Sequence, residues 1–190
     1  HDEVVSYLRV SSKNVVEVFF SDRSLGLHLQ IESISLNLIN FYAPQSNHPV
    51  EYKTIFWDSL LVNCKKLAKI LNIVGCDANS SVGHCTSASI GDHQATGHCF
   101  NAARLSSLCL FLKCFLPATF AFFHSGSGNT FKKSRIDFVA LPIDWIKKGI
   151  SSKIHGEESF LNAFGHKPAA VVVTEGATGK SNLINRRTSG

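Results

Sequence analysis

The hydrophobic pattern of the first forty residues is typical of β-strands. From Leu25 to Ile31 every second residue is Leu or Ile, and the residues between them are Gly, His and Gln. This period of two predicts a strand with one buried face. Three further apolar runs, at residues 4–10, 15–20 and 34–41, predict further strands. We therefore expect the N-terminal part of the chain to be β-structure.

A helical pattern follows the segment Tyr42-Ala43-Pro44-Gln45. Five apolar residues after Pro49 fall near one face of a helix: Tyr52, Ile55, Phe56, Leu60 and Leu67. The short apolar run at 70–74, followed by Gly75, is long enough for a strand and too short for a helix. The pattern thus predicts a helix that leads into a buried strand.

The second half of the chain alternates between polar loops and short apolar runs. Residues 76–97 are rich in Ser, Gly, His and Asn, which predicts a long loop of the kind that often carries function. We then expect a helix at 101–112, strands at 118–123 and 135–141 paired around a Gly-rich turn, one helical turn at 142–148 and a strand at 169–174. The order of elements predicts one mixed α/β domain over residues 1–174, followed by a disordered tail at 175–190.

Composition agrees with a single globular domain. The chain has 190 residues, of which 44% are hydrophobic and 17% charged. The formal net charge of +5 favours an anionic partner only weakly. No apolar stretch reaches the roughly 20 residues that a membrane-spanning helix needs. The first residues lack a signal-peptide pattern, so we expect a nuclear or cytoplasmic location, and we interpret the chain as a fragment that starts within a longer gene.

The six cysteines show no CxxC pair, and we expect them to be free thiols. The triplet Gly-His-Cys occurs twice, at 83–85 and at 97–99. Two His and two Cys are a ligand set that zinc accepts, but adjacent ligands are not a usual spacing. Loop residues without a metal are the favoured interpretation of the two triplets.

Four polar motifs stand at the ends of predicted strands. They are Tyr42-Ala43-Pro44, Gly75-Cys76-Asp77-Ala78-Asn79, Ser134-Arg135-Ile136-Asp137-Phe138 and Gly165-His166-Lys167-Pro168. Asp77 and Asn79 alone can be explained as turn residues. His166 alone or Tyr42 alone is a weak signal, whereas Asp137 in an apolar strand requires a partner, because a buried carboxylate does. Together they supply the groups that phosphodiester chemistry needs at strand ends, where α/β folds place ligands.

Each group in these motifs has a chemical use. The Asp77 carboxylate and the Asn79 amide are oxygen ligands for a hard divalent cation. His166 with the Asp137 carboxylate behind it is a general-base or charge-stabilising pair. The hydroxyl of Tyr42 can donate a hydrogen bond to a phosphate oxygen.

The segments that carry these motifs resemble the endonuclease/exonuclease/phosphatase family, which includes deoxyribonuclease I, abasic-site endonucleases and LINE-type retrotransposon endonuclease domains. The resemblance rests on four segments. Residues 38–44 resemble the family's apolar strand that ends in Tyr-x-Pro, and residues 56–60 resemble the helix that follows it. Residues 73–79 resemble the family's Gly-Asp-x-Asn motif, with Cys76 in place of glycine, and residues 129–139 resemble its stretch from Thr-Trp to Ile-Asp-Tyr, with Thr130-Phe131 and Ile136-Asp137-Phe138 at these positions. It is closest in style to the retrotransposon endonucleases.

The resemblance implies a fold, a reaction and residue roles. The fold would be a two-sheet α/β sandwich of the deoxyribonuclease I type, incomplete at the N-terminus. The reaction would be phosphodiester hydrolysis in DNA that depends on Mg²⁺ or Mn²⁺. Asp77 would orient or activate the attacking water and bind the metal with Asn79, Asp137 would support His166, and Tyr42 would contact the phosphate.

Two departures leave alternatives open. Gly165 stands where the family has a metal-binding Asp, and the family's N-terminal segment with its Glu has no counterpart. The resemblance therefore implies a weakly held metal and little cleavage. A catalytically dead remnant or nucleic-acid-binding scaffold of the same fold is one alternative, and a phosphatase of small phosphoesters is another. Lys132, Lys133 and Arg135 favour nucleic acid, because phosphate contacts dominate such binding. A solvated edge strand explains the same three charges equally well.

Overall fold

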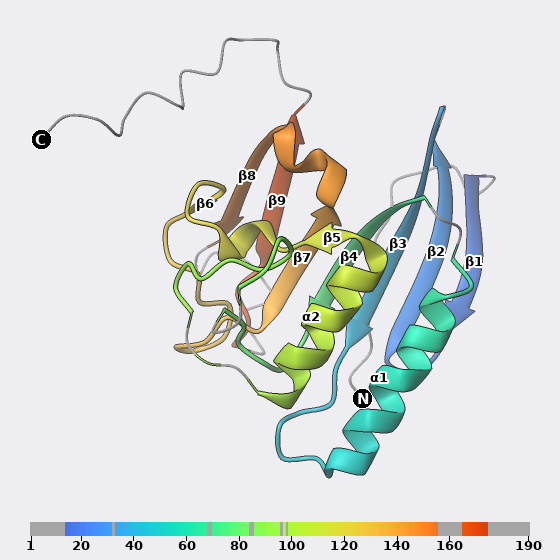
Figure 1. Ribbon diagram of the computed structural model, residues 1–190, viewed down its shortest axis with the longest axis horizontal. Helices are drawn as coiled ribbons and strands as arrows, with labels where there is room; N and C mark the ends of the chain where they lie inside the picture. The colour runs from blue at the N-terminus through green and yellow to red at the C-terminus, as the bar shows by residue number, and fades with distance from the viewer. Residues whose placement is uncertain are drawn as a thin grey trace, which may run out of the picture.

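A computed structural model of the chain describes residues 14–31, 33–67, 70–83, 86–95, 97, 99–155 and 165–174. Two sheets and two α-helices form the domain (Figure 1). The six-stranded sheet has the order β1 (Val15–Phe20), β2 (Ser24–Ile31), β3 (Ile34–Tyr42), β4 (Leu71–Asp77), β7 (Asp137–Pro142) and β5 (Cys114–Phe115). The three-stranded sheet has the order β6 (His124–Ser125), β8 (Gly149–Ile154) and β9 (Ala169–Thr174).

The directions of the central strands decide where a site can form. β1, β2 and β3 are antiparallel neighbours, whereas β4 runs parallel to β3 after the crossover through α1 (Val50–Cys64). β7 is antiparallel to β4. The carboxyl ends of β3 and β4 and the amino end of β7 therefore lie side by side at one end of the central strands.

The helices α1 and α2 (Phe100–Leu112) cover one face of the large sheet (Figure 1). Strand residues that point to this face alternate with residues that do not, as the period of two requires. The shared core contains Ile39, Phe41, Val74, Cys76 and Phe138 from the sheet, Trp57 and Leu60 from α1, and Leu105, Leu108 and Cys109 from α2. This apolar layer fixes which strand residues remain for the opposite face.

The small sheet packs on that opposite face, over β4 and β7. Phe115, Phe123 and Leu141 form the centre of the contact, and Ile73, Val139, Ile150, Val171 and Val173 pack around them. The expected two-sheet α/β sandwich is confirmed. The chain thus has three layers, with helices outside the large sheet and the small sheet on its other side.

Several expectations about elements were right and others wrong. The strands at 15–20 and 169–174 have the expected bounds, and the expected helix at 101–112 is α2. Residues 118–123 are not a strand: Pro117–Thr119 form the 3₁₀-helix η2, because the Thr119 hydroxyl donates to Leu116 O and accepts from Gly91 N. β7 consequently pairs with β4 and β5 and not with 118–123.

Two further differences concern helices and a strand. The expected helical turn is the 3₁₀-helix η3 (Ile143–Lys147), and it leads into β8, which the sequence pattern missed. In α1 the buried residues are Lys53, Trp57, Leu60 and Cys64, so the expectation that Tyr52 and Ile55 face the core was wrong. The expected strand at 4–10 and the tail at 175–190 lie outside the described residues.

Among the described residues, no helix is long and apolar enough to cross a membrane. The described cysteines 64, 76, 99, 109 and 114 are free thiols, as expected. Burial raises the pKa of Cys64 to about 12, so this thiol stays neutral and acts as a core residue. The alternative of a zinc site at the two Gly-His-Cys triplets falls largely outside the described residues.

Candidate active site

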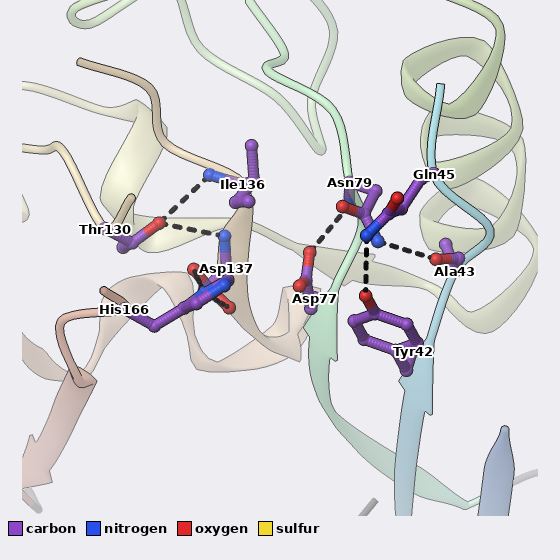
Figure 2. Close-up of polar contacts among 9 residues, drawn as sticks. All are labelled: Tyr42, Ala43, Gln45, Asp77, Asn79, Thr130, Ile136, Asp137 and His166. Carbon is purple, nitrogen blue, oxygen red and sulfur yellow. Dashed lines mark hydrogen bonds and ion pairs between the residues drawn. The ribbon is translucent and has the colours of Figure 1, made fainter. Parts of the chain in front are cut away.

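The register of the central strands brings the predicted site residues together. Tyr42 lies beside Asp77 in the parallel pair β3–β4, and Asp77 lies opposite Asp137 in the antiparallel pair β4–β7. In Figure 2 the side chains of Tyr42, Asp77 and Asp137 form a row across three strands, with His166 next to Asp137. Side chains along a strand alternate between the two faces of a sheet. Asp77 and Asp137 therefore lie on the same face as Ile73 and Val139, which is the face away from the helices, and Tyr42 shares this face because it is the partner of Asp77.

The imidazole of His166 is held by Asp137. Its Nδ1 lies 3.1 Å from one carboxylate oxygen of Asp137 and 3.3 Å from the other. Nδ1 is thus occupied, and Nε2 is the ring nitrogen left for a substrate. The amino end of β7 is itself fixed, because the buried Thr130 hydroxyl accepts hydrogen bonds from the backbone N–H of Ile136 and of Asp137.

His166 is also fixed by the turn that precedes β7. The Phe131 and His166 rings lie 4.6 Å apart between centroids and are tilted by 34°. The backbones of the same two residues form an isolated β-bridge, and Lys167 N donates to Thr130 O at 2.6 Å. These contacts hold the segment that follows Gly165, so His166 stays next to Asp137.

Asp77 and Asn79 form a closed turn at the end of β4. The Asn79 N–H donates to the Asp77 carboxylate at 2.8 Å, and Asn79 adopts a left-handed conformation with φ of 46°. Asn tolerates this conformation better than most residues. The Asn79 side-chain amide donates to Ala43 O at 2.7 Å, which leaves its carbonyl oxygen for a ligand. The geometry therefore ties the Asp-x-Asn segment to the Tyr-x-Pro segment.

Electrostatics distinguish Asp77 from an ordinary surface carboxylate. Burial and the neighbouring Asp137 carboxylate raise the pKa of Asp77 to about 6, against the opposing effects of the Asn79 N–H and His166. A carboxylate with this pKa is ionised at neutral pH and yet basic enough to take a proton from water.

Three side chains of the site form a group that suits a divalent cation. Asp77, Asp137 and His166 each offer one ligand atom, and the three atoms lie within 4.8 Å of one another. Two carboxylate oxygens and one imidazole nitrogen fit Mn²⁺ well, and the oxygens fit Mg²⁺. Of the predicted ligand pair Asp77 and Asn79, Asp77 belongs to this cluster, in which Asp137 and His166 are already engaged with each other.

Tyr42 and Arg23 form a polar corner beside Asp77. Gln45 Nε2 donates to the Tyr42 hydroxyl oxygen at 3.3 Å, so the phenolic hydrogen is not used in that contact. The Arg23 guanidinium lies 5.2 Å from the Tyr42 ring centroid. Arg23 Nη1 is buried and has no hydrogen-bond partner within the described structure. An unpaired buried donor of a cation favours an anion at this position.

The sequence motifs named the central residues but not all of their partners. Arg23 and Phe131 were missed as site residues, since neither has a spacing that marks it. Arg135 was expected near a nucleic-acid surface, and that expectation was wrong. Arg135 is 4% exposed, and its guanidinium donates to the main-chain oxygens of Gly128, His93 and Ala118.

Comparison with known proteins supports the fold assignment. No protein-family model and no curated protein matches the sequence. Among solved structures, the endonuclease domain of TRAS1, a telomere-specific non-LTR retrotransposon, is similar with a TM-score of 0.54 and 15% identity. That match covers 87% of this chain and 70% of the TRAS1 domain.

A 3'-5' exonuclease from Neisseria meningitidis is similar with a TM-score of 0.55 and 14% identity, covering 80% of this chain and 65% of the exonuclease. A Neisseria 3' phosphatase bound to a product DNA hairpin is similar with a TM-score of 0.53 and 14% identity, covering 82% of this chain and 65% of the phosphatase. This chain therefore spans about two thirds of the length of these structures. The resemblance seen in the sequence is confirmed at the level of the fold, which is that of deoxyribonuclease I-like endonuclease/exonuclease/phosphatase proteins.

Proposed function

We propose that this chain carries a phosphodiesterase site that acts on DNA with the help of a divalent metal. The observation that carries the proposal is the group formed by Asp77 and the Asp137–His166 pair, whose ligand atoms lie within 4.8 Å of one another. The Asp77 carboxylate, together with an imidazole that the Asp137 carboxylate supports, lies at the ends of neighbouring strands and is suited to hydrolysis of a charged ester.

Each residue has a role in the proposed reaction. Asp77 accepts a proton from a water molecule while the water oxygen attacks phosphorus and the bond to the leaving ester oxygen breaks. The leaving oxygen takes a proton from solvent. His166, oriented through Nδ1 by Asp137, presents Nε2 to the charge that develops on the phosphate oxygens. The Tyr42 hydroxyl and the Arg23 guanidinium hold a non-bridging oxygen.

The metal would be held by Asp77, with Asn79 and the Asp137–His166 pair close by. When bound, a divalent cation neutralises part of the charge on the phosphate. Mn²⁺ is the better expected partner, because Mg²⁺ requires near-ideal octahedral geometry and gives up its waters reluctantly, and the site offers few carboxylates. Gly165 offers no side-chain ligand, so weak metal binding is expected.

A DNA substrate is favoured over small phosphoesters by two observations. Lys132 and Lys133 are exposed on the turn whose Phe131 contacts His166, so cationic groups lie next to the site. One similar structure is described as bound to a product DNA hairpin. The expected nuclear or cytoplasmic location is compatible with a DNA substrate.

The rival proposal is a scaffold of the same fold that binds nucleic acid without cleaving it. Gly165 favours this rival, because the position carries no carboxylate. A descent from a retrotransposon endonuclease suits either proposal, and a reverse transcriptase encoded downstream would support it.

Plasmid nicking tests the proposal directly. The unaltered chain should nick supercoiled DNA slowly, faster with Mn²⁺ than with Mg²⁺, and both Asp77→Ala and His166→Ala should abolish nicking. Asp58→Ala, an exposed acidic residue of α1 paired with Arg104, is the matched control and should not change the rate. Binding of DNA without nicking would support the scaffold, and nicking that survives both site variants would identify a contaminating nuclease.

A further inference from the structure

Asn101 is buried in the first turn of α2, with 1% of its surface exposed. Its side-chain Nδ2 donates to Pro44 O at 2.7 Å and to Ala78 O at 3.1 Å. Its Oδ1 accepts from the indole N–H of Trp57 in α1 at 3.0 Å. Because an indole N–H can only donate, the amide atom of Asn101 that faces Trp57 must be the oxygen. One side chain therefore joins both helices to two separate main-chain segments.

The two segments joined by Asn101 are those that carry the site. Pro44 lies two residues beyond Tyr42, and Ala78 lies between Asp77 and Asn79. The segments are also bonded to each other, because Ala43 N donates to Asp77 O at 2.8 Å and Asn79 Nδ2 donates to Ala43 O. Asn101 adds the link from this pair of segments to the helical layer on the far face of the sheet.

We propose that Asn101 is a positioning residue that sets the spacing between Tyr42 and the Asp77–Asn79 turn. The proposal rests on the proposed function, since the spacing matters for the phosphate that these residues would hold. Because a buried amide with three hydrogen bonds has no competing water, it holds both segments in one arrangement. A shift of either segment would separate the proposed phosphate contact from the proposed base.

The chain contains a matched control at the other end of β4. Asn72 is 8% exposed, donates to Ile70 O and Leu112 O, and accepts from Asn37 Nδ2. It thus makes the same three types of hydrogen bond as Asn101 but lies at the amino end of β4, away from the site. A general loss of stability should be similar for Asn101→Ser and Asn72→Ser.

Hydrogen exchange and kinetics separate positioning from general stability. In Asn101→Ser the Ala43 and Ala78 amides should exchange about tenfold faster or more, with the β1–β2 amides unchanged. Nicking kcat should fall by about 10- to 100-fold with KM within about twofold. In Asn72→Ser neither local exchange at Ala43 and Ala78 nor kcat should change.

A milder variant keeps the test decisive if Asn101→Ser does not fold. Trp57→Phe keeps an aromatic ring but removes the indole N–H, and it should show the same local exchange pattern to a smaller extent. If both Asn101→Ser and Trp57→Phe leave exchange at Ala43 and Ala78 as in Asn72→Ser, the positioning role is overturned. Exchange does not require activity, so a chain that fails to nick would overturn the proposed function while the exchange result still decides the role of Asn101.

Discussion

The Phe131 ring packs against the His166 imidazole, with the ring centroids 4.6 Å apart. The same imidazole is bonded through Nδ1 to Asp137. His166 is consequently oriented by two different residues, one apolar and one charged, that flank the short turn before β7.

This double support predicts the effect of shortening the aromatic side chain. Phe131→Leu should lower nicking kcat by about tenfold, because the imidazole gains freedom to rotate away from the phosphate. Phe131→Trp should retain most of the rate. Phe122→Leu is the control, since Phe122 is 71% exposed and belongs to another aromatic group. A change in KM alone would contradict the predicted role.

The raised pKa of Asp77 predicts a stability change that depends on pH. Below the unfolded-state pKa of about 3.9 the carboxyl is protonated in both states and contributes nothing. As pH rises from there to the folded-state pKa of about 6, the unfolded state ionises first and the folded state loses relative stability, and above that pKa the loss stays constant. Asp77→Asn should therefore raise the free energy of unfolding by about 1–3 kcal/mol near neutral pH, and by almost nothing in strong acid.

Urea unfolding at several pH values measures this difference. Asp58→Asn serves as a control, because an exposed pair such as Asp58–Arg104 contributes little at any pH. Equal effects of Asp77→Asn at acid and neutral pH would show that the burial of the carboxyl has no electrostatic cost.

Gly165 predicts that the missing carboxylate cannot simply be restored. Its φ is 76°, and a Cβ there would lie 3.4 Å from the Phe131 ring. Gly165→Asp should cost about 1–2 kcal/mol of stability and should not increase nicking, because the new side chain strains the segment that holds His166.

The comparison of two alanine variants tests that explanation. Gly126 has a φ of 83° but no atom within 4 Å of a Cβ. Gly126→Ala should thus show backbone strain alone, whereas Gly165→Ala should also disturb the His166 ring signals in an NMR spectrum. A faster nicking rate in Gly165→Asp would contradict the prediction.

The exposed lysines of the turn predict a specific salt dependence. The double variant Lys132→Gln/Lys133→Gln should weaken DNA binding and reduce the slope of log K against log salt by about 2, or one unit for each lost phosphate contact. Lys65→Gln/Lys66→Gln changes two exposed lysines at the end of α1 and should leave the slope unchanged.

Arg135→Gln should instead lower thermal stability, because Arg135 is buried among main-chain oxygens.

Local patterns were enough to find the strand ends that carry the motifs. Tyr42, Asp77 and Asp137 stand at ends of apolar runs, and parallel pairing of β3 with β4 then brings two of them together. Local patterns failed where a distant contact decides the conformation. β8 has the polar sequence Gly-Ile-Ser-Ser-Lys-Ile, and its buried Ser152 is explained only by His124 from β6.

Supporting residues were hidden for the same reason. Trp57 and Asn101 are 44 positions apart, and no spacing rule connects them. Arg23 lies in the turn between β1 and β2, and its local sequence indicates only an ordinary connection between two strands. The residues that meet at the strand ends were therefore predictable, while the residues that hold them in place were not.

The register of β4 against β7 has a consequence for how this chain can vary. Asp77 lies directly opposite Asp137, and Cys76 lies opposite Phe138 on the helical side of the sheet. One residue inserted into either strand would turn its carboxylate into the apolar core and push a core residue out toward the other sheet. Length changes are thus expected only outside this strand pair, where additional residues leave both carboxylates on the same face.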